Sequence, residues 1–432
     1  MNNFQNSSLD YITRIQNLGI IFLFFICCIE FSVQIMGMGV TANYFYMLFP
    51  FIFLIQGMQR RLVIRKEMLL IFSVFIIIYL IRSPIEVIDL EVNLYSIFRR
   101  FASFLVFMFP LVLSFIEFKS RDIYLFKMAV ILACLLYSIN KIILFVSVKM
   151  GYFVWADHTA SLVTESINLK GIVGSQRYGF VLLFAFFITL FQRKLFFESK
   201  VVLQKIFILL ILLISLYITF SRATFVAFLA TVLIFTWRRY FTNHYFNIGM
   251  HKVSSLTLKL KGALVIVGLF GLLFLLFYFF SDSGVLSYYK ERFIQPFMPD
   301  SAGFMMNPDS SEGYRLYLIS KVLDYVSLHP ISGSNFQGLF MLYDEFKGGV
   351  STHNQYMDVL LRVGLIGVIL WLYLLYRIYK FCKNDDGLLF GLIAILIYGL
   401  VHETFKLSYG SFLFGMLLSF SYSFVKTKGS LK

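Results

Sequence analysis

The chain of 432 residues has the composition of a membrane protein. Apolar residues make up 59% of it and charged residues only 14%, whereas soluble domains average about 45–50% apolar and about 25% charged residues. The formal charge of +15 is spread between apolar runs and forms no single soluble patch, so no nucleic-acid partner is expected. The four cysteines lie in or beside apolar runs without metal-ligand spacing, which indicates neither a disulfide framework nor a metal site.

Apolar runs of about 17–25 residues recur along the chain and are long enough to cross a bilayer core of about 30 Å as helices. They do not alternate apolar and polar residues as barrel strands do. The expected fold class is therefore all-α, a polytopic membrane protein of about twelve helices with one large loop. The predicted spans are 17–37, 40–58, 67–82, 99–118, 125–148, 177–192, 204–220, 222–237, 262–281, 363–380, 387–403 and 408–425.

Basic residues follow every second predicted span, as Arg60 and Arg61 follow the second and Lys426 and Lys428 the last. The positive-inside rule then places both termini in the cytoplasm. Three parts are expected: 1–281 with spans one to nine, 282–362 as a large periplasmic loop, and 363–432 with spans ten to twelve and a cytoplasmic tail. The first apolar run is too long for a signal peptide and is interpreted as a retained span of a multi-pass protein of the bacterial inner membrane.

The large loop has the polar composition of a soluble domain. Ser310 or Ser311 is a plausible N-cap for an amphipathic helix that ends at His329-Pro330. A turn is predicted at 333–335 and a second short helix at 336–346. His353 then opens the tenth span after a Gly-Gly break.

Eight cations lie at predicted outer ends of spans, where the topology rule does not place them. They are Arg82, Arg99, Arg100, Arg177, Arg222, Arg315, Arg362 and Lys406. The planar fork of arginine matches phosphate oxygens, so a ring of arginines at one membrane face would suit a lipid-linked pyrophosphate. The alternative for each is that its side chain extends to lipid headgroups.

Arg222 is the strongest of these candidates. It lies in a tight polar turn, 219–224, between two apolar runs, and such a turn is costly in lipid unless it faces a water-filled cavity. Arg177 opens the sixth span after two glycines, and Arg315 lies on the amphipathic helix. For both of these, a substrate-binding role and a solvated charge are equally good interpretations.

His353 is the candidate base, because a neutral imidazole accepts a proton near neutral pH. The alternative is a histidine that caps the following helix. Asn354 either orients a substrate hydroxyl or caps that helix. His402 and Glu403 are ionisable groups near the outer end of the eleventh span, and they either line a cavity together with Lys406 or pair with it.

Motifs for other chemistry are missing from the sequence. It has no Asp-x-Asp pair in a soluble Rossmann-like domain, no Walker loop, no Cys/His cluster and no Gly-x-Ser-x-Gly. Use of ATP or nucleotide sugars is not expected, and no cofactor and no metal is required.

His353-Asn354, followed after nine residues by Gly364-Leu365-Ile366-Gly367, resembles the pattern His-[Asn/Ser/Gln]-x9-Gly-x-x-Gly of O-antigen ligases and their relatives. The Ser221-Arg222-Ala223 turn is similar to theirs, as is the run from Arg315 to His329-Pro330-x-x-Gly333. The resemblance covers 170–410 by motif and the full chain by topology.

The resemblance implies metal-independent, inverting glycosyl transfer of the membrane-embedded GT-C type on the periplasmic side. The donor would be a glycan on undecaprenyl pyrophosphate. The acceptor would be a lipid A core sugar in a ligase or a second lipid-linked repeat unit in a Wzy-type polymerase. A chain-length regulator or flippase would be a possible companion in the membrane.

The resemblance also assigns roles to residues. His353, Arg222 and Arg315 are the expected catalytic residues, with His353 as base or acceptor-orienting group. Arg177 would grip the pyrophosphate with the other arginines, although Gln176 before it departs from the family's usual small or Asn residue. The residue types and positions alone, apart from the resemblance, add Asn354, His402 and Lys406 to the expected substrate-binding set.

Three functions remain open on the sequence. The His-Asn-x9-Gly pattern favours a ligase over a polymerase. A third branch of the family transfers glycan to protein serines, and the chain is too short for that branch, whose members carry an extra C-terminal domain. A twelve-helix transporter or flippase fits the span count, but common carriers place their long loop centrally and inside. A sensor or structural protein would leave the arginines expendable.

Overall fold

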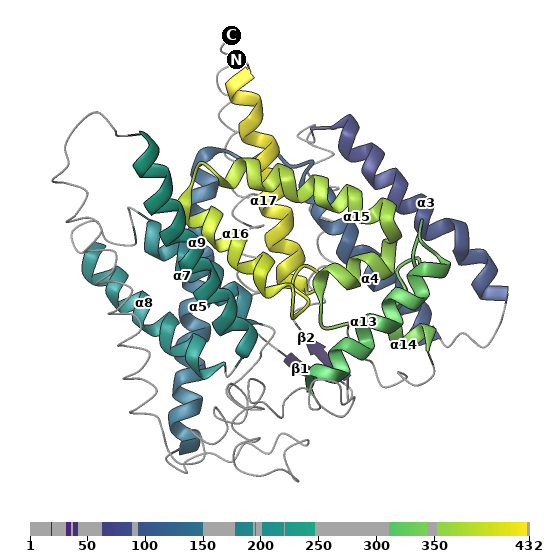
Figure 1. Ribbon diagram of the computed structural model, residues 1–432, viewed down its shortest axis with the longest axis horizontal. Helices are drawn as coiled ribbons and strands as arrows, with labels where there is room; N and C mark the ends of the chain where they lie inside the picture. Colours follow the sequence, from purple (N-terminus) through teal and green to yellow (C-terminus); the bar gives the residue numbers. More distant parts are fainter. Residues whose placement is uncertain are drawn as a thin grey trace. The chain divides into compact units, whose positions relative to one another are not determined.

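The computed structural model describes residues 19, 32–35, 38–41, 63–88, 94–149, 178–192, 195, 201–219, 221–246, 311–343 and 352–429. The helices in these ranges are α3 (Lys66–Ile88), α4 (Leu94–Leu113), α5 (Ser120–Lys149), α7 (Gly179–Phe191), α8 (Val201–Ile218), α9 (Arg222–Phe246), α13 (Ser311–Leu328), α14 (Leu339–Leu342), α15 (Gln355–Cys382), α16 (Asp386–Tyr398) and α17 (Ser408–Gly429) (Figure 1). The strands are β1 (Ser32–Ile35) and β2 (Met38–Thr41).

Most predicted spans coincide with helices. The third to eighth and the tenth to twelfth each fall on a helix, while 262–281 lies outside the described residues. Three helical segments are long and apolar enough to cross a membrane, namely Ser120–Ser147, Val201–Ile218 and Gln355–Cys382. Four shorter apolar helices accompany them in the described part of the chain. The helical membrane class is therefore supported, whereas the count of twelve spans is not confirmed.

The first two predicted spans need a correction where they adjoin. β1 and β2 pair antiparallel from Ser32↔Thr41 to Ile35↔Met38, so the helices predicted over 17–37 and 40–58 do not extend through these residues. The physical reason is local: β-branched residues suit a pleated strand, and Gly39 disfavours a helix. The described elements are otherwise helical.

The chain falls into two compact units. The first comprises Met1–Tyr137, Phe180–Leu209 and Arg315–Lys432, and the second comprises Ser138–Gly179 and Leu210–Tyr314. The first unit contains the whole of α15, α16 and α17, and with them the segment around His353.

Close packing of α17 on α4 fixes the frame of the first unit. Small residues recur every four positions along α17, at Ser411, Gly415 and Ser419. The Ser411 hydroxyl donates to the Val106 carbonyl at 2.6 Å, and the Ser419 hydroxyl donates to the Ile116 carbonyl at 2.7 Å. A Cβ added to Gly415 would lie 2.6 Å from a side-chain atom of α4. Small side chains let two apolar helices approach closely without a hydrophobic driving force from water.

The loop preceding α15 contains the predicted helix, turn and second short helix. α13 spans Ser311–Leu328, as the capping and periodicity signals predict, and a turn follows it. The second helix, α14, is only Leu339–Leu342 and is shorter than the predicted 336–346. α15 begins at Gln355, close to His353, which is expected to open this span, and before the predicted limit at 363; Asn354 provides its N-cap.

α15 is broken at Gly364, whose φ of 62° and ψ of −167° are not helical. Residues 330–336, here called the docking turn, lie across the break. Four backbone hydrogen bonds join the two: Ser334 N to Leu361 O, Phe336 N to Arg362 O, Leu365 N to Pro330 O and Ile366 N to Ile331 O. The docking turn therefore satisfies the backbone groups that the break releases, which an apolar environment requires.

Two glycines make this contact possible. Gly333 and Gly364 have φ of 59° and 62°, a left-handed region that favours glycine. A Cβ on Gly333 would overlap the Leu361 carbonyl oxygen, and one on Gly364 would overlap the Ile331 carbonyl oxygen. The glycine of His-Pro-x-x-Gly, Gly333, and the first glycine of Gly-x-x-Gly, Gly364, thus meet in one backbone-to-backbone contact.

Replacing Gly364 with alanine is expected to destabilise the protein by at least about 2 kcal/mol, because the backbone conformation is strained for an L side chain and the Cβ overlaps the docking turn. Thermal unfolding of the purified protein in detergent measures this. Leu365→Ala is the matched control, since Leu365 is 52% exposed and contributes its backbone N–H unchanged. Equal melting temperatures for Gly364→Ala and the wild type would contradict the assignment.

Candidate functional site

His353 lies directly before α15, and its neighbour Asn354 is the residue that caps the helix. The Asn354 side-chain oxygen accepts hydrogen bonds from the backbone N–H groups of Tyr356 at 2.9 Å and Met357 at 3.1 Å. Its amide nitrogen donates to the Leu400 carbonyl at 2.8 Å. Of the two roles expected for Asn354, the structure thus shows helix capping, and the cap is not supplied by His353.

His353 itself adopts a φ of 52°, which is uncommon for a residue other than glycine. Its ring is half-buried, and it meets the His402 ring edge to face with centroids 6.0 Å apart. His402 is buried and stacks on Tyr398 at 5.1 Å. His353 and His402, two of the predicted site residues, therefore lie next to each other.

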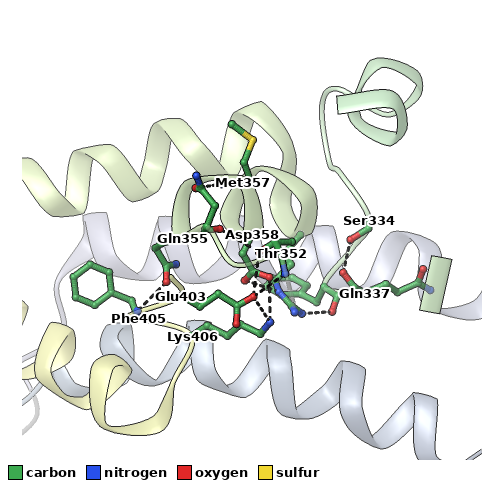
Figure 2. Close-up of polar contacts among 12 residues, drawn as sticks. Ser334, Gln337, Thr352, Gln355, Met357, Asp358, Glu403, Phe405 and Lys406 are labelled. Atoms are coloured by element: carbon green, nitrogen blue, oxygen red, sulfur yellow. Dashed lines mark hydrogen bonds and ion pairs between the residues drawn. The ribbon is translucent and has the colours of Figure 1, made fainter. Parts of the chain in front are cut away.

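The start of α15 is anchored to the connection between α16 and α17. The backbone N–H of Gln355 donates to the Gly399 carbonyl at 2.8 Å. The Gln355 side-chain oxygen accepts from the backbone N–H groups of Thr404 at 2.8 Å and Phe405 at 2.9 Å. These bonds join two segments that are some fifty positions apart in sequence and fix the start of α15 against the segment between α16 and α17 (Figure 2).

Four charged side chains and Thr352 form a cluster beside His353, and Figure 2 shows Thr352, Asp358, Glu403 and Lys406 converging on one another. The Lys406 ammonium lies 2.8 Å from Glu403 Oε1 and 3.3 Å from Asp358 Oδ1. The same Glu403 oxygen accepts from the backbone N–H and the hydroxyl of Thr352, at 3.2 and 3.1 Å. Sequence left open whether Glu403 lines a cavity or pairs with Lys406, and the structure shows the pair.

Asp358 and Arg362 form the buried half of this cluster. Their side chains are each 1% exposed, and Arg362 Nε donates to Asp358 Oδ2 at 2.8 Å. The guanidinium also donates to the Phe336 carbonyl of the docking turn at 2.9 Å. A second buried arginine, Arg100, donates from Nε to the Asn335 carbonyl at 2.9 Å.

These contacts correct the expectation for two members of the proposed arginine ring. Arg362 and Arg100 are 1% and 6% exposed, and both point at main-chain carbonyls of the docking turn. They hold Phe336 in place, which is fully buried among aromatic rings that include Phe75 and Phe104. Neither arginine extends to lipid headgroups.

The other three arginines of the predicted site belong to other segments of the chain. Arg222 is the first residue of α9, in the second compact unit, and Ser221 before it caps that helix by accepting the Thr224 N–H at 3.3 Å. Arg315 is half-buried on α13. Arg177 lies outside the described residues. Of the predicted site residues, the structure thus brings together His353, Asn354, His402 and Lys406.

Sequence reasoning missed Thr352, Gln355 and Asp358. Asp358 had a detectable signal, because its carboxylate is four positions before Arg362 in an otherwise apolar helix, and such spacing places both on one face. Thr352 and Gln355 had none, since their partners at 403–405 are distant in sequence.

Residues 206–372 match the family model described as O-antigen ligase, Wzy_C. The matched range contains Arg222, Arg315, His353 and the broken turn at Gly364. It confirms the resemblance to the superfamily of O-antigen ligases and Wzy-type proteins. Members of this family are glycosyltransferase-like enzymes with lipid-linked glycan substrates, and together with the apolar helices the match points to a bacterial membrane protein. No significant match was found among curated proteins.

Replacing Arg362 with alanine is expected to cost about 3–5 kcal/mol of stability, because Asp358 is left as a buried carboxylate without its closest partner. Arg377→Ala is the control: its pair with Glu67 is 3.5 Å long and partly exposed, with side chains 20% and 43% accessible, and is expected to contribute about 0–1 kcal/mol. Unfolding midpoints in detergent report the difference. Equal losses of stability for the two variants would contradict this expectation, because they would show that the buried Asp358–Arg362 pair contributes no more than an exposed pair.

Proposed function

We propose that this chain, which matches the O-antigen ligase family model over residues 206–372, transfers a glycan from undecaprenyl pyrophosphate to a sugar of the lipid A core. The transfer takes place on the periplasmic side of the bacterial inner membrane, with both termini of the chain in the cytoplasm. The positive-inside pattern of the basic residues supports this orientation.

His353 acts as the base in this proposal. Its neutral imidazole accepts the proton of the acceptor hydroxyl. The hydroxyl oxygen then attacks the anomeric carbon of the donor glycan with the electron pair of the former O–H bond. The bond from that carbon to the pyrophosphate oxygen breaks on the opposite side, and the pyrophosphate leaves with the bonding electrons. A single displacement of this kind inverts the anomeric configuration.

Arginines supply the positive charge that the leaving group needs. Arg222 and Arg315, with Arg177, are proposed to bind the pyrophosphate oxygens through their planar forks. Fixed cations stabilise charge where it develops, so no metal ion is needed for the departure of the pyrophosphate.

The observation that carries the proposal is that Asn354 caps α15. The alternative role of His353 was helix capping, and Asn354 fills that role with two hydrogen bonds. His353 is left with a half-buried ring next to His402, on a backbone anchored at its following residues. A base must be held in place to be effective.

The acceptor separates the ligase from the runner-up function. In a Wzy-type polymerase, a second lipid-linked repeat unit would take the place of the lipid A core sugar, with the same base and the same leaving group. The His-Asn-x9-Gly pattern favours the ligase.

His353→Ala is expected to lower glycan transfer at least about 100-fold, the usual contribution of a positioned base. The test is a deletion strain complemented with wild type or His353→Ala, with lipopolysaccharide and carrier-linked glycan compared on gels. His251→Ala is the matched control, because the topology predicts that residue on the cytoplasmic side. Arg222→Ala is expected to lower glycan transfer as well. Unchanged bands for both His353→Ala and Arg222→Ala would overturn the proposal in favour of a transporter.

The same gels distinguish ligase from polymerase. Loss of a ligase leaves full-length glycan on the carrier lipid and none on the core. Loss of a polymerase instead lets single repeat units reach the core.

A further inference from the structure

We propose that Lys406 is a positioning residue for His353 and does not contact the pyrophosphate. Lys406 would act through Glu403 and Thr352, which connect it to the backbone of His353. This inference rests on the proposed role of His353 in glycan transfer.

The connection is a continuous chain of polar contacts. The Lys406 ammonium bridges Glu403 at 2.8 Å and Asp358 at 3.3 Å. Glu403 Oε1 accepts the backbone N–H of Thr352 at 3.2 Å and its hydroxyl at 3.1 Å. Thr352 is bonded to His353 through the next peptide, so one carboxylate oxygen links the ammonium to the segment that carries the imidazole.

Charge balance explains why Lys406 is needed there. Asp358 and Glu403 are 1% and 9% exposed, and the ammonium that lies between them keeps their two negative charges from repelling each other. With Arg362 on Asp358, the members of the cluster that the structure describes are two carboxylates and two cations, whose formal charges cancel. Among the described residues, the positive charge of Lys406 is thus matched by Asp358 and Glu403 and is not presented to a pyrophosphate.

His353 needs such support because its backbone is strained. A residue other than glycine at φ 52° persists only where its surroundings determine its conformation. The Thr352 hydroxyl lies 3.1 Å from the Glu403 carboxylate and 3.1 Å from the Asn354 carbonyl oxygen, so it connects the residues before and after His353 to Glu403. Without Lys406, Glu403 would move away from Asp358 and release Thr352, and the imidazole would lose its fixed position.

The test measures kinetics of the purified full-length protein with undecaprenyl-pyrophosphate-linked glycan extracted from the deletion strain and glycan-free lipopolysaccharide as acceptor. Lys406→Met is expected to lower kcat about 10- to 100-fold, the usual effect of a misplaced catalytic group. The KM and the binding affinity for the lipid-linked donor should stay close to those of the wild type. Lys406→Arg should restore most of kcat, since a guanidinium can also bridge two carboxylates.

Thr352→Val tests the same link without removing a charge, in case Lys406→Met does not fold. It deletes the hydroxyl that contacts Glu403 and the Asn354 carbonyl and should lower kcat with unchanged donor KM, whereas Thr352→Ser should be close to the wild type. Lys380→Met is the control for loss of a lysine, because Lys380 is exposed and lies in the last turn of α15, far along the helix from Asn354.

The outcomes separate this inference from the proposed function. If His353→Ala is inactive and both Lys406→Met and Thr352→Val keep the wild-type kcat, only the positioning role is wrong. A raised donor KM with unchanged kcat in Lys406→Met would show that Lys406 binds the donor. Full activity of His353→Ala would overturn both proposals.

Discussion

The site depends on the docking of residues 330–336 against the broken turn of α15. A break in an apolar helix exposes backbone groups that lipid cannot satisfy, and here the docking turn supplies four hydrogen bonds to them. The approach is possible only because Gly333 and Gly364 have no Cβ at the contact. The glycines of the family pattern are thus a structural requirement, and they fix the start of α15 with respect to the loop that precedes it.

Buried charges complete this arrangement. Arg362 links Asp358 on α15 to the docking turn, and Lys406 links the same carboxylate to Glu403 after α16. Asp358 therefore connects, through Arg362 and Lys406, the docking turn and the segment after α16, which are distant in sequence. Such a network costs desolvation and contributes little net stability, but it gives polar groups defined positions. In this protein the residue held at its edge is His353.

Much of this organisation is readable from the sequence, and the exceptions have physical reasons. Caps and periodicity predict α13 because those signals are local, and two of the cations singled out from the sequence, Arg362 and Lys406, belong to the cluster beside His353. The sequence predicts that Arg362 and Arg100 reach a pyrophosphate or lipid headgroups, but both are buried. The sequence does not show whether an arginine at the end of a span extends into solvent or into the protein interior. The hairpin of β1 and β2 is missed because hydropathy alone does not distinguish a short apolar strand from a helix.

The most direct test of the central claim is glycan transfer by the purified protein in lipid vesicles. The reaction would contain undecaprenyl-pyrophosphate-linked glycan, glycan-free lipopolysaccharide and a metal chelator, with wild type and His353→Ala compared. The account predicts glycan on the lipid A core with the wild type, undiminished by the chelator, and at least about a 100-fold slower reaction with His353→Ala. Equal transfer by the two proteins, or transfer by neither, would contradict it.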